Sequence, residues 1–378
     1  MIIHPPESKQ ANGKFTIYSR LEYAQDRGLP DTLWFSVDEG FSSIAANRSD
    51  IFLSSLIRTA RAIEEDIEVR GELSPKLLYG MREYLRVHAS WSGNPYTPEI
   101  HAENLLPAER SGPGAASCNI SGGVDSFYTL WSQLPENEPL PDLQIRYGIF
   151  GIGYSSPTHN DNLRAQYVPF LKRRMQSLDV DLIVVDTNAN TFSHPSPWWV
   201  MSTSRIAIPQ LFPSLCSTHF HPSSDMYLHL KPYGSHPMTN HMFSTEATRI
   251  LTHGAQLFRS EKLLRIKDWD FIHDLLQVCN HPTPNSINDS RCRKCARTTL
   301  ALNVFGARSK FTTFQPQSKR QGLARRLVVS ENMAGDFTFL AQYAREHGRK
   351  ELLPRILIPL MLYKLTGWIE ALFGQKFR

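Results

Sequence analysis

The pattern of apolar and polar positions indicates a small mixed module at the start of the chain. Residues 14–19 and 32–37 are short runs rich in β-branched and aromatic side chains, which predict two neighbouring strands. Apolar residues recur at helical spacing over 51–63, and a Ser-Pro pair opens a second helical stretch over 74–85. We therefore expect residues 1–112 to form an α+β module.

Beyond a Pro- and Gly-rich stretch, the pattern becomes an alternation of apolar strands and helices. The expected strands cover residues 115–120, 144–152, 180–186 and 226–230, and the expected helices 127–134, 160–178 and 198–212. Such alternation is typical of a parallel sheet with helices on both faces. The fold class predicted for residues 113–307 is therefore α/β.

The remaining segment, 308–378, is predicted to be helical. Its basic cluster, Lys319, Arg320, Arg325 and Arg326, has no interleaved aromatic residues, which favours a solvated helical face over a nucleic-acid groove. The apolar stretch 352–372 is broken by prolines and charged residues, so we expect a docked terminal helix and not a membrane span.

Composition narrows the class of protein. The 378 residues suggest two or three domains, and 41% apolar with 20% charged residues excludes a mainly disordered or coiled-coil chain. A formal charge of +5 is a thin excess for an RNA-binding enzyme. An odd number of cysteines, five, and a start without a basic and apolar leader predict a soluble, cytoplasmic protein.

The most informative stretch is Ser121-Gly122-Gly123-Val124-Asp125-Ser126, between an expected strand and an expected helix. Two glycines let the backbone approach phosphate oxygens, hydroxyl groups add donors, and the helix N-terminus adds partial positive charge. Asp125 inside such a loop predicts either a magnesium ligand or a group that holds the loop. No Gly-Lys-Ser/Thr follows, which disfavours γ-phosphate kinase chemistry.

Strand–SGGVDS–helix resembles the PP-loop ATP pyrophosphatases, the group that includes GMP synthetase, tRNA 2-thiouridylases and 7-cyano-7-deazaguanine synthase. The resemblance covers about residues 115–307. It implies a HUP-like PP-loop fold, ATP with Mg²⁺ bound by the loop residues and Phe150, and adenylation of a carbonyl or carboxylate oxygen. A nitrogen or sulfur nucleophile would then displace AMP.

This chemistry needs cations opposite the α-phosphate. Arg259, Lys262 and His236 fall where the resemblance implies them, and Ser244 and Thr245 are weaker candidates. Spacing alone would make Glu261–Lys262 a solvated helix face.

Histidines and tryptophans before the cation candidates leave alternatives open. His219-x-His221 could bind a metal, although ordinary hydrogen-bonded side chains are the more common outcome of this spacing. Trp198–Trp199 could form a lid over a planar substrate or anchor the core.

Four residues, Cys279, Asp289, Cys292 and Cys295, form a C-x9-D-x2-C-x2-C pattern. The C-x2-C spacing suits tetrahedral zinc, and the run resembles the zinc knuckle of 7-cyano-7-deazaguanine synthase. Asp289 stands where that family has a further cysteine, so zinc would take Asp289 or His281 as its fourth ligand or keep that position open. A degenerate knuckle of free thiols and a persulfide carrier are the alternatives, the latter because neighbouring Arg and Lys residues would lower a thiol pKa.

The leading functional prediction is ATP-dependent thiolation of a small molecule or nucleotide, with Cys216 as the sulfur-handling residue and Cys118 as a weaker candidate. The resemblance would then add a cysteine desulfurase-like sulfur donor as a partner. The alternatives are an amide- or nitrile-forming C–N ligase, a tRNA-modifying thiolase and a nucleotide-binding module without turnover. A homodimer is left open.

Overall fold

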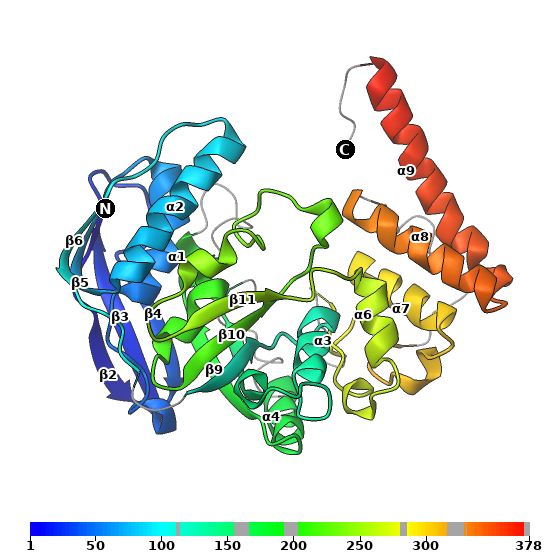
Figure 1. The fold of residues 1–378 in the computed structure, drawn as a ribbon, viewed down its shortest axis with the longest axis horizontal. Coiled ribbons are helices and arrows are strands. Elements are labelled where there is room, and N and C mark those ends of the chain that lie inside the picture. The colour runs from blue at the N-terminus through cyan, green and yellow to red at the C-terminus, as the bar shows by residue number, and fades with distance from the viewer. Residues whose placement is uncertain are drawn as a thin grey trace.

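The computed structural model describes residues 1–110, 114–154, 166–192, 203–279, 286–315, 329 and 331–373. Within these residues the strands form one sheet of eleven, in the order β11-β10-β7-β8-β9-β4-β3-β1-β5-β6, with β2 paired to β3. Figure 1 shows this sheet running through the body, with the N-terminal strands at one end and the C-terminal helices at the other. The protein is thus α/β with a large, mostly parallel central sheet.

Five neighbouring strands are parallel, and their order is set by crossover helices. They are β7 (Ala115–Asn119), β8 (Ile145–Ile152), β9 (Asp181–Thr187), β10 (Cys216–Pro222) and β11 (Arg249–His253). The helices α3 (Val124–Ser132) and α4 (Val168–Gln176) connect β7 to β8 and β8 to β9. The predicted strands that became β7, β8 and β9 are confirmed.

The predicted strand at 226–230 is wrong. Tyr227–His229 is a short 3-10 helix, and the strands of this region are β10 and β11. The short apolar run at 226–230 is half exposed, with Tyr227 and Leu228 facing solvent. In β10, two buried histidines, His219 and His221, occupy positions where an apolar residue would have indicated a strand. Burial is decided by the neighbouring strands, which a local pattern does not contain.

The two faces of the sheet carry separate cores. One core packs α3, α4, α6 (Arg259–Ile266) and α7 (Arg293–Val304) on the parallel strands. The other packs α1 (Asp50–Ile63) and α2 (Pro75–Ser92) with the segment 203–212. In β9, Leu182 and Val184 enter the first core and Ile183 and Val185 the second, as alternation along a doubly covered strand requires.

The N-terminal residues extend the same sheet. Their strands are β1 (Ile2–Ile3), β2 (Glu7–Ala11), β3 (Lys14–Glu22), β4 (Thr32–Asp38), β5 (Ile67–Leu73) and β6 (Ile100–Leu105). The expectation that 14–19 and 32–37 are neighbours is confirmed, since β3 and β4 pair antiparallel. β4 also pairs antiparallel with β9, which joins the N-terminal strands to the parallel ones.

Two C-terminal helices follow, α8 (Glu331–Glu346) and α9 (Leu353–Phe373). α8 packs into the first core through Phe337, Leu340 and Ala344. α9 buries Ile356 and Leu360, but Ile358, Met361, Leu362 and Leu365 are exposed, and Figure 1 shows the helix projecting beyond α8. The expectation of a docked terminal helix therefore holds only for its first turns.

In the part of the chain that is described, no helix combines the length and the apolar character that a bilayer crossing requires. The predicted basic cluster Lys319, Arg320, Arg325 and Arg326, the pair Trp198–Trp199 and the alternative ligand His281 lie outside the described residues.

Candidate phosphate site and metal centre

The loop Ser121–Ser126 lies at the carboxyl end of β7, the strand at which the order of successive strands reverses. β7 is the first parallel strand, and its neighbours β8 and β10 lie on opposite sides of it. In open α/β sheets this switch point leaves a crevice at the carboxyl ends of the strands, which is where ligands bind. The loop that the sequence singled out therefore occupies the favoured position for a ligand.

Hydrogen bonds within the loop hold its turn. The Ser126 hydroxyl donates to the Gly123 carbonyl at 3.0 Å and accepts the Ser121 N–H at 3.2 Å. The Gly122 carbonyl accepts the Gln277 N–H at 2.8 Å, which ties the loop to a distant segment.

Gly122 cannot carry a side chain. Its φ is +78°, and a Cβ there would lie 2.0 Å from the Tyr167 hydroxyl oxygen. The Tyr167 hydroxyl donates to the Leu275 carbonyl at 2.9 Å, so the tyrosine is fixed against the loop. Both conditions select glycine.

Asp125 lies in the first turn of α3 and holds two cations. Its Oδ2 lies 2.5 Å from Arg259 Nη1, and its Oδ1 lies 3.1 Å from Lys262 Nζ. Lys262 is buried and also donates to the Ser223 carbonyl at 2.6 Å, just beyond β10. Burial by itself would raise the pKa of Asp125, but Arg259 and Lys262 outweigh it and lower that pKa to about 2.

These contacts assign the roles left open by the sequence. Both Asp125 oxygens are engaged by cations, which makes Asp125 the group that holds Arg259 and Lys262 beside the loop. The loop is largely buried: only Ser121 is exposed, and the Asp125 side chain is 14% exposed.

The start of α6 is held by two carboxylates. Glu261 accepts the Phe258 N–H at 2.7 Å, so it caps its own helix. Asp336 of α8 accepts the Ser260 N–H at 2.8 Å. The solvated-face alternative for Glu261–Lys262 is therefore wrong for Lys262, whose ammonium points inward to Asp125.

Three further cations surround the pair, and the sequence did not assign them to this site. Arg259 and Asp125 lie close enough to Lys294 and Arg297 of α7 to influence their pKa values, and Arg205 acts on Lys294 in the same way. Desolvation and the guanidinium groups of Arg259, Arg205 and Arg297 lower the pKa of Lys294 to about 8. The i, i+3 spacing of Lys294 and Arg297 on one helix face was a usable signal, whereas Arg205 carried none.

The charge around the loop is unbalanced. Within the described residues, the guanidinium groups of Arg205 and Arg297 make no hydrogen bond or ion pair. Asp125 is already shared between Arg259 and Lys262. The region is therefore prepared for an anion with several charged oxygens.

The predicted cysteine cluster is assembled. The ligand atoms of Cys279, Asp289, Cys292 and Cys295 all lie within 4.8 Å of one another, so the cluster could hold a metal such as zinc. The Cys279 and Cys292 sulfurs are 3.7 Å apart, close to the roughly 3.8 Å between two thiolates bound tetrahedrally at about 2.3 Å. The Cys292 sulfur accepts the Cys295 N–H, and the Cys279 sulfur accepts the Asp289 N–H, each at 3.4 Å.

One buried asparagine organises the loop around the cluster. Asn288 accepts the Val278 and Cys279 N–H groups at 2.9 and 3.2 Å and donates to the Leu276 carbonyl at 2.8 Å. The prediction of a lowered thiol pKa is wrong for Cys295. Hydrogen bonding to the other two thiols, together with burial, raises the pKa of Cys295, while the Lys294 and Arg297 charges lie toward Asp125.

The metal cluster and the phosphate loop share structural supports. Gln277 bonds to Gly122 and lies two residues before Cys279, and α7 starts from Cys292 and carries Lys294 and Arg297. A metal in the cluster would thus fix both the back of the loop and the helix that supplies two of the cations.

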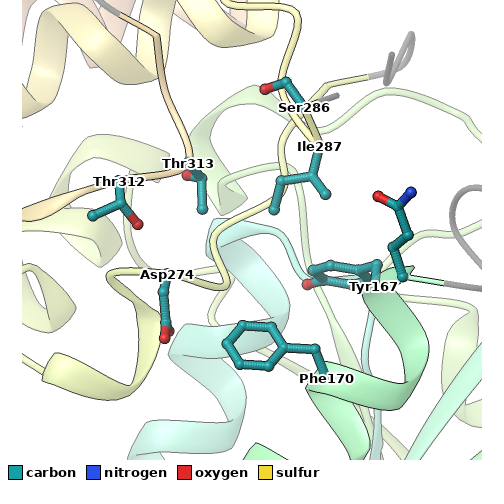
Figure 2. A pocket seen from close by; sticks show the side chains of 8 residues that line it. Tyr167, Phe170, Asp274, Ser286, Ile287, Thr312 and Thr313 are labelled. Atoms are coloured by element: carbon teal, nitrogen blue, oxygen red, sulfur yellow. The ribbon is translucent and has the colours of Figure 1, made fainter. Parts of the chain in front are cut away.

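Tyr167 also lines a cavity of about 280 Å³ (Figure 2). Its other walls are Gln166, Phe170, Asp274, Ser286, Ile287, Thr312 and Thr313. The Thr313 and Ser286 hydroxyls donate to the carbonyls of Leu276 and Asn288, respectively, so their protons are already engaged within the protein. The cavity is one side chain away from Gly122.

Several predicted site residues lie elsewhere. Cys216 begins β10 and so lies at the amino ends of the parallel strands, opposite the loop. Burial raises the pKa of Cys216 to about 12. Ser244 and Thr245 form the turn before β11, also at the amino ends of the strands, and their hydroxyls accept the Ile250 and Thr248 N–H groups, respectively. Cys216, the predicted sulfur-handling residue, therefore lies away from the phosphate loop, because β10 starts at this cysteine and the loop follows the carboxyl end of the parallel strand β7.

His236 and Phe150 are packed into the structure. His236 packs against Trp91 of α2 with the ring centroids 4.6 Å apart and the rings tilted by 52°. Burial lowers the pKa of His236, so it is not a cation for phosphate. Phe150 is buried in the first core against Tyr167 and has no exposed face for a nucleotide. Cys118 is fully buried in the same core, as expected for a small apolar residue.

His219 is an ordinary hydrogen-bonded histidine. It is fully buried, with Nδ1 beside the Ser117 hydroxyl and Nε2 beside Asn119 Oδ1. Because both ring nitrogens are occupied, the His219-x-His221 metal site is not formed.

Comparisons of this chain with protein-family models, with curated proteins and with solved structures found no significant match.

Proposed function

We propose that this protein is an ATP pyrophosphatase of the PP-loop type, which adenylates an oxygen of a small acceptor and releases pyrophosphate. One observation carries the proposal: a Gly-rich loop at a helix start lies among four cationic side chains, those of Lys262, Arg259, Arg205 and Arg297. Arg205 and Arg297 form no ion pair with another described residue. This arrangement suits the triphosphate of a nucleotide.

The strand order supports the same proposal. Numbered along the chain, the five parallel strands run 3-2-1-4-5, the order of doubly wound nucleotide-binding folds, with the loop after the first strand. A HUP-like domain would have this arrangement.

The proposed chemistry uses the charges in place. Loop N–H groups and the α3 N-terminus bind the β- and γ-phosphates, and Lys262 and Arg259 stabilise the negative charge that develops at the α-phosphate. Magnesium would arrive with ATP. Attack by the acceptor oxygen breaks the α–β bond, and pyrophosphate leaves into the basic surroundings of Lys294 and Arg297.

The nucleophile that then displaces AMP comes with a third substrate, distinct from ATP and from the acceptor. Cys216 lies at the far edge of the sheet and Cys118 inside the core, so neither supports an enzyme-bound persulfide. Ammonia or an amine would make the protein the predicted C–N ligase, whereas a free sulfide donor would make it a thiolating enzyme without an enzyme-bound persulfide. If instead the protein thiolates through its own thiol, Cys216→Ser or Cys118→Ser would abolish product while adenylate still forms.

The test is product identification with Mg-ATP and a small-molecule extract. We expect AMP and pyrophosphate in equal amounts, and ADP with phosphate as the stoichiometric products would refute the proposal. Lys262→Ala should lower AMP formation at least 100-fold. The matched control is Lys267→Ala just after the same helix. Among the described residues this lysine side chain pairs with Asp268, so its removal should leave the rate unchanged.

A further inference from the structure

Beside the phosphate loop, polar side chains gather on the face of the sheet that carries the second core. Asn119 of β7 and His221 of β10 lie on this face near the carboxyl ends of their strands. Asn119 Nδ2 donates to the Arg205 carbonyl at 2.9 Å, which brings the segment 203–207 over the same strands. Tyr154 follows β8, on the other side of β7.

Hydrogen bonds lead from Asn240 through Ser235 to the Nε2 atom of His221. The His236 N–H donates to Asn240 Oδ1 at 2.9 Å, so the Asn240 amide nitrogen is the atom that faces Ser235 Oγ at 3.3 Å. Ser235 Oγ accepts this bond, and within the described residues its own proton has one acceptor, His221 Nε2 at 3.0 Å. With Ser235 as the donor to Nε2, the neutral His221 ring carries its hydrogen on Nδ1.

That Nδ1–H has no partner. His221 is 8% exposed, and its Nδ1 is buried without a hydrogen bond within the described residues. The Tyr154 hydroxyl is in the same condition, with the residue 1% exposed. Buried donors without partners are rare in folded proteins, because each costs about 1–3 kcal/mol.

Arg205 adds a charge to the two neutral donors. Its guanidinium group acts electrostatically on both Tyr154 and His221, and it makes no ion pair within the described residues. All three groups are donors, and one of them is cationic. The complementary ligand is an acceptor with negative charge.

We propose that Tyr154, His221 and Arg205 form the acceptor subsite and bind a carboxylate of the second substrate. The assignment of this ligand as the acceptor of the adenylyl group rests on the proposed function, whereas the carboxylate site itself rests on these three donors. Lys294 interacts electrostatically with Arg205 of this subsite and with Asp125 beside the phosphate loop.

The experiment uses the full chain and ligand-observed NMR with a panel of aliphatic, aromatic, heterocyclic and amino carboxylic acids. Each acid is paired with its carboxamide, with and without Mg-α,β-methylene-ATP. We expect at least one acid to bind and its amide to bind at least tenfold more weakly. Tyr154→Phe should weaken the acid about tenfold or more and leave the affinity for the nucleotide analogue within twofold, and Arg205→Gln should weaken the acid by a similar factor.

Tyr147→Phe, on the same strand β8, is the matched control and should change neither affinity. The proposal is overturned if acids and amides bind alike or if acids bind Tyr154→Phe as tightly as the parent. It is also overturned if the nucleotide binds but no acid does, because the two orphan donors then hold buried water. Acid binding without nucleotide binding would support the subsite and reject the ATP proposal.

Discussion

The Ser260 N–H donates to Asp336 Oδ1 at 2.8 Å, across 76 residues of sequence. This bond ties α8 to the first turn of α6, the helix that carries Arg259 and Lys262. Asp336 also acts electrostatically on Arg297 of α7. The C-terminal segment is therefore a structural part of the phosphate site.

Asp336→Ala should weaken that site from outside it. It leaves a buried N–H without an acceptor, and we expect a loss of about 1–3 kcal/mol in unfolding free energy and a weaker affinity for Mg-ATP. Asp336→Asn, which keeps an acceptor oxygen, should recover most of the stability. Urea unfolding and nucleotide titration measure both effects. Glu346→Ala, at the exposed end of α8, is the control, and equal losses in the Asn and Ala variants would contradict the hydrogen-bond role.

The Asp125 carboxylate should stabilise the fold in a pH-dependent way. Its pKa falls from 3.8 to about 2 on folding, which corresponds to about 2 kcal/mol. Because the folded pKa is the lower one, this stability is present above about pH 4 and is lost as the pH falls toward 2. The deficit of Asp125→Asn should thus be constant between pH 7 and 5 and shrink below pH 4.

Urea unfolding at pH 7, 5 and 3.5 checks this, with Asp142→Asn as an exposed-carboxylate control. A deficit that stays the same at pH 3.5 would argue against the ion pairs. Asp125→Asn should also lower AMP formation about 100-fold or more at pH 7.

Lys294 should make nucleotide affinity depend on mildly alkaline pH. With a pKa of about 8, it is charged at pH 7 and neutral by pH 9.5. The Kd for Mg-ATP should therefore rise as the pH increases through 8, and Lys294→Arg should remove this rise because arginine stays charged. Lys294→Gln should bind weakly at both values. A flat profile for the parent protein would place Lys294 outside the site.

Metal content separates the knuckle from free thiols. We expect about one zinc per chain by elemental analysis, and Cys292→Ser should lose it together with several degrees of Tm. Cys216→Ser, at the opposite edge of the sheet, should keep the metal. A metal-free protein whose Cys279, Cys292 and Cys295 all react with an alkylating probe would show that the cluster does not hold zinc.

The local sequence determined several elements without help from the fold. The strands β7, β8 and β9 and the helix start at Pro75 follow from apolar runs and capping residues, which act over a few positions. The helix predicted over 127–134 is also present, but it starts three residues earlier, at Val124. The loop 121–126 and the C-x2-C knuckle were recognisable for the same reason, since their ligand groups are close in sequence.

Tertiary structure alone decided which residues surround the loop. Arg205, Lys294 and Asp336 reach it from elements far apart in the chain, and only packing against the sheet brings them together. Cys216 shows the converse. Its place in the sequence was known, but whether it lies at the amino or the carboxyl ends of the strands depends on the register of β10 against β7. Strand direction and sheet order are non-local, so a pattern of single residues could not place that cysteine or the orphan donors of Tyr154 and His221.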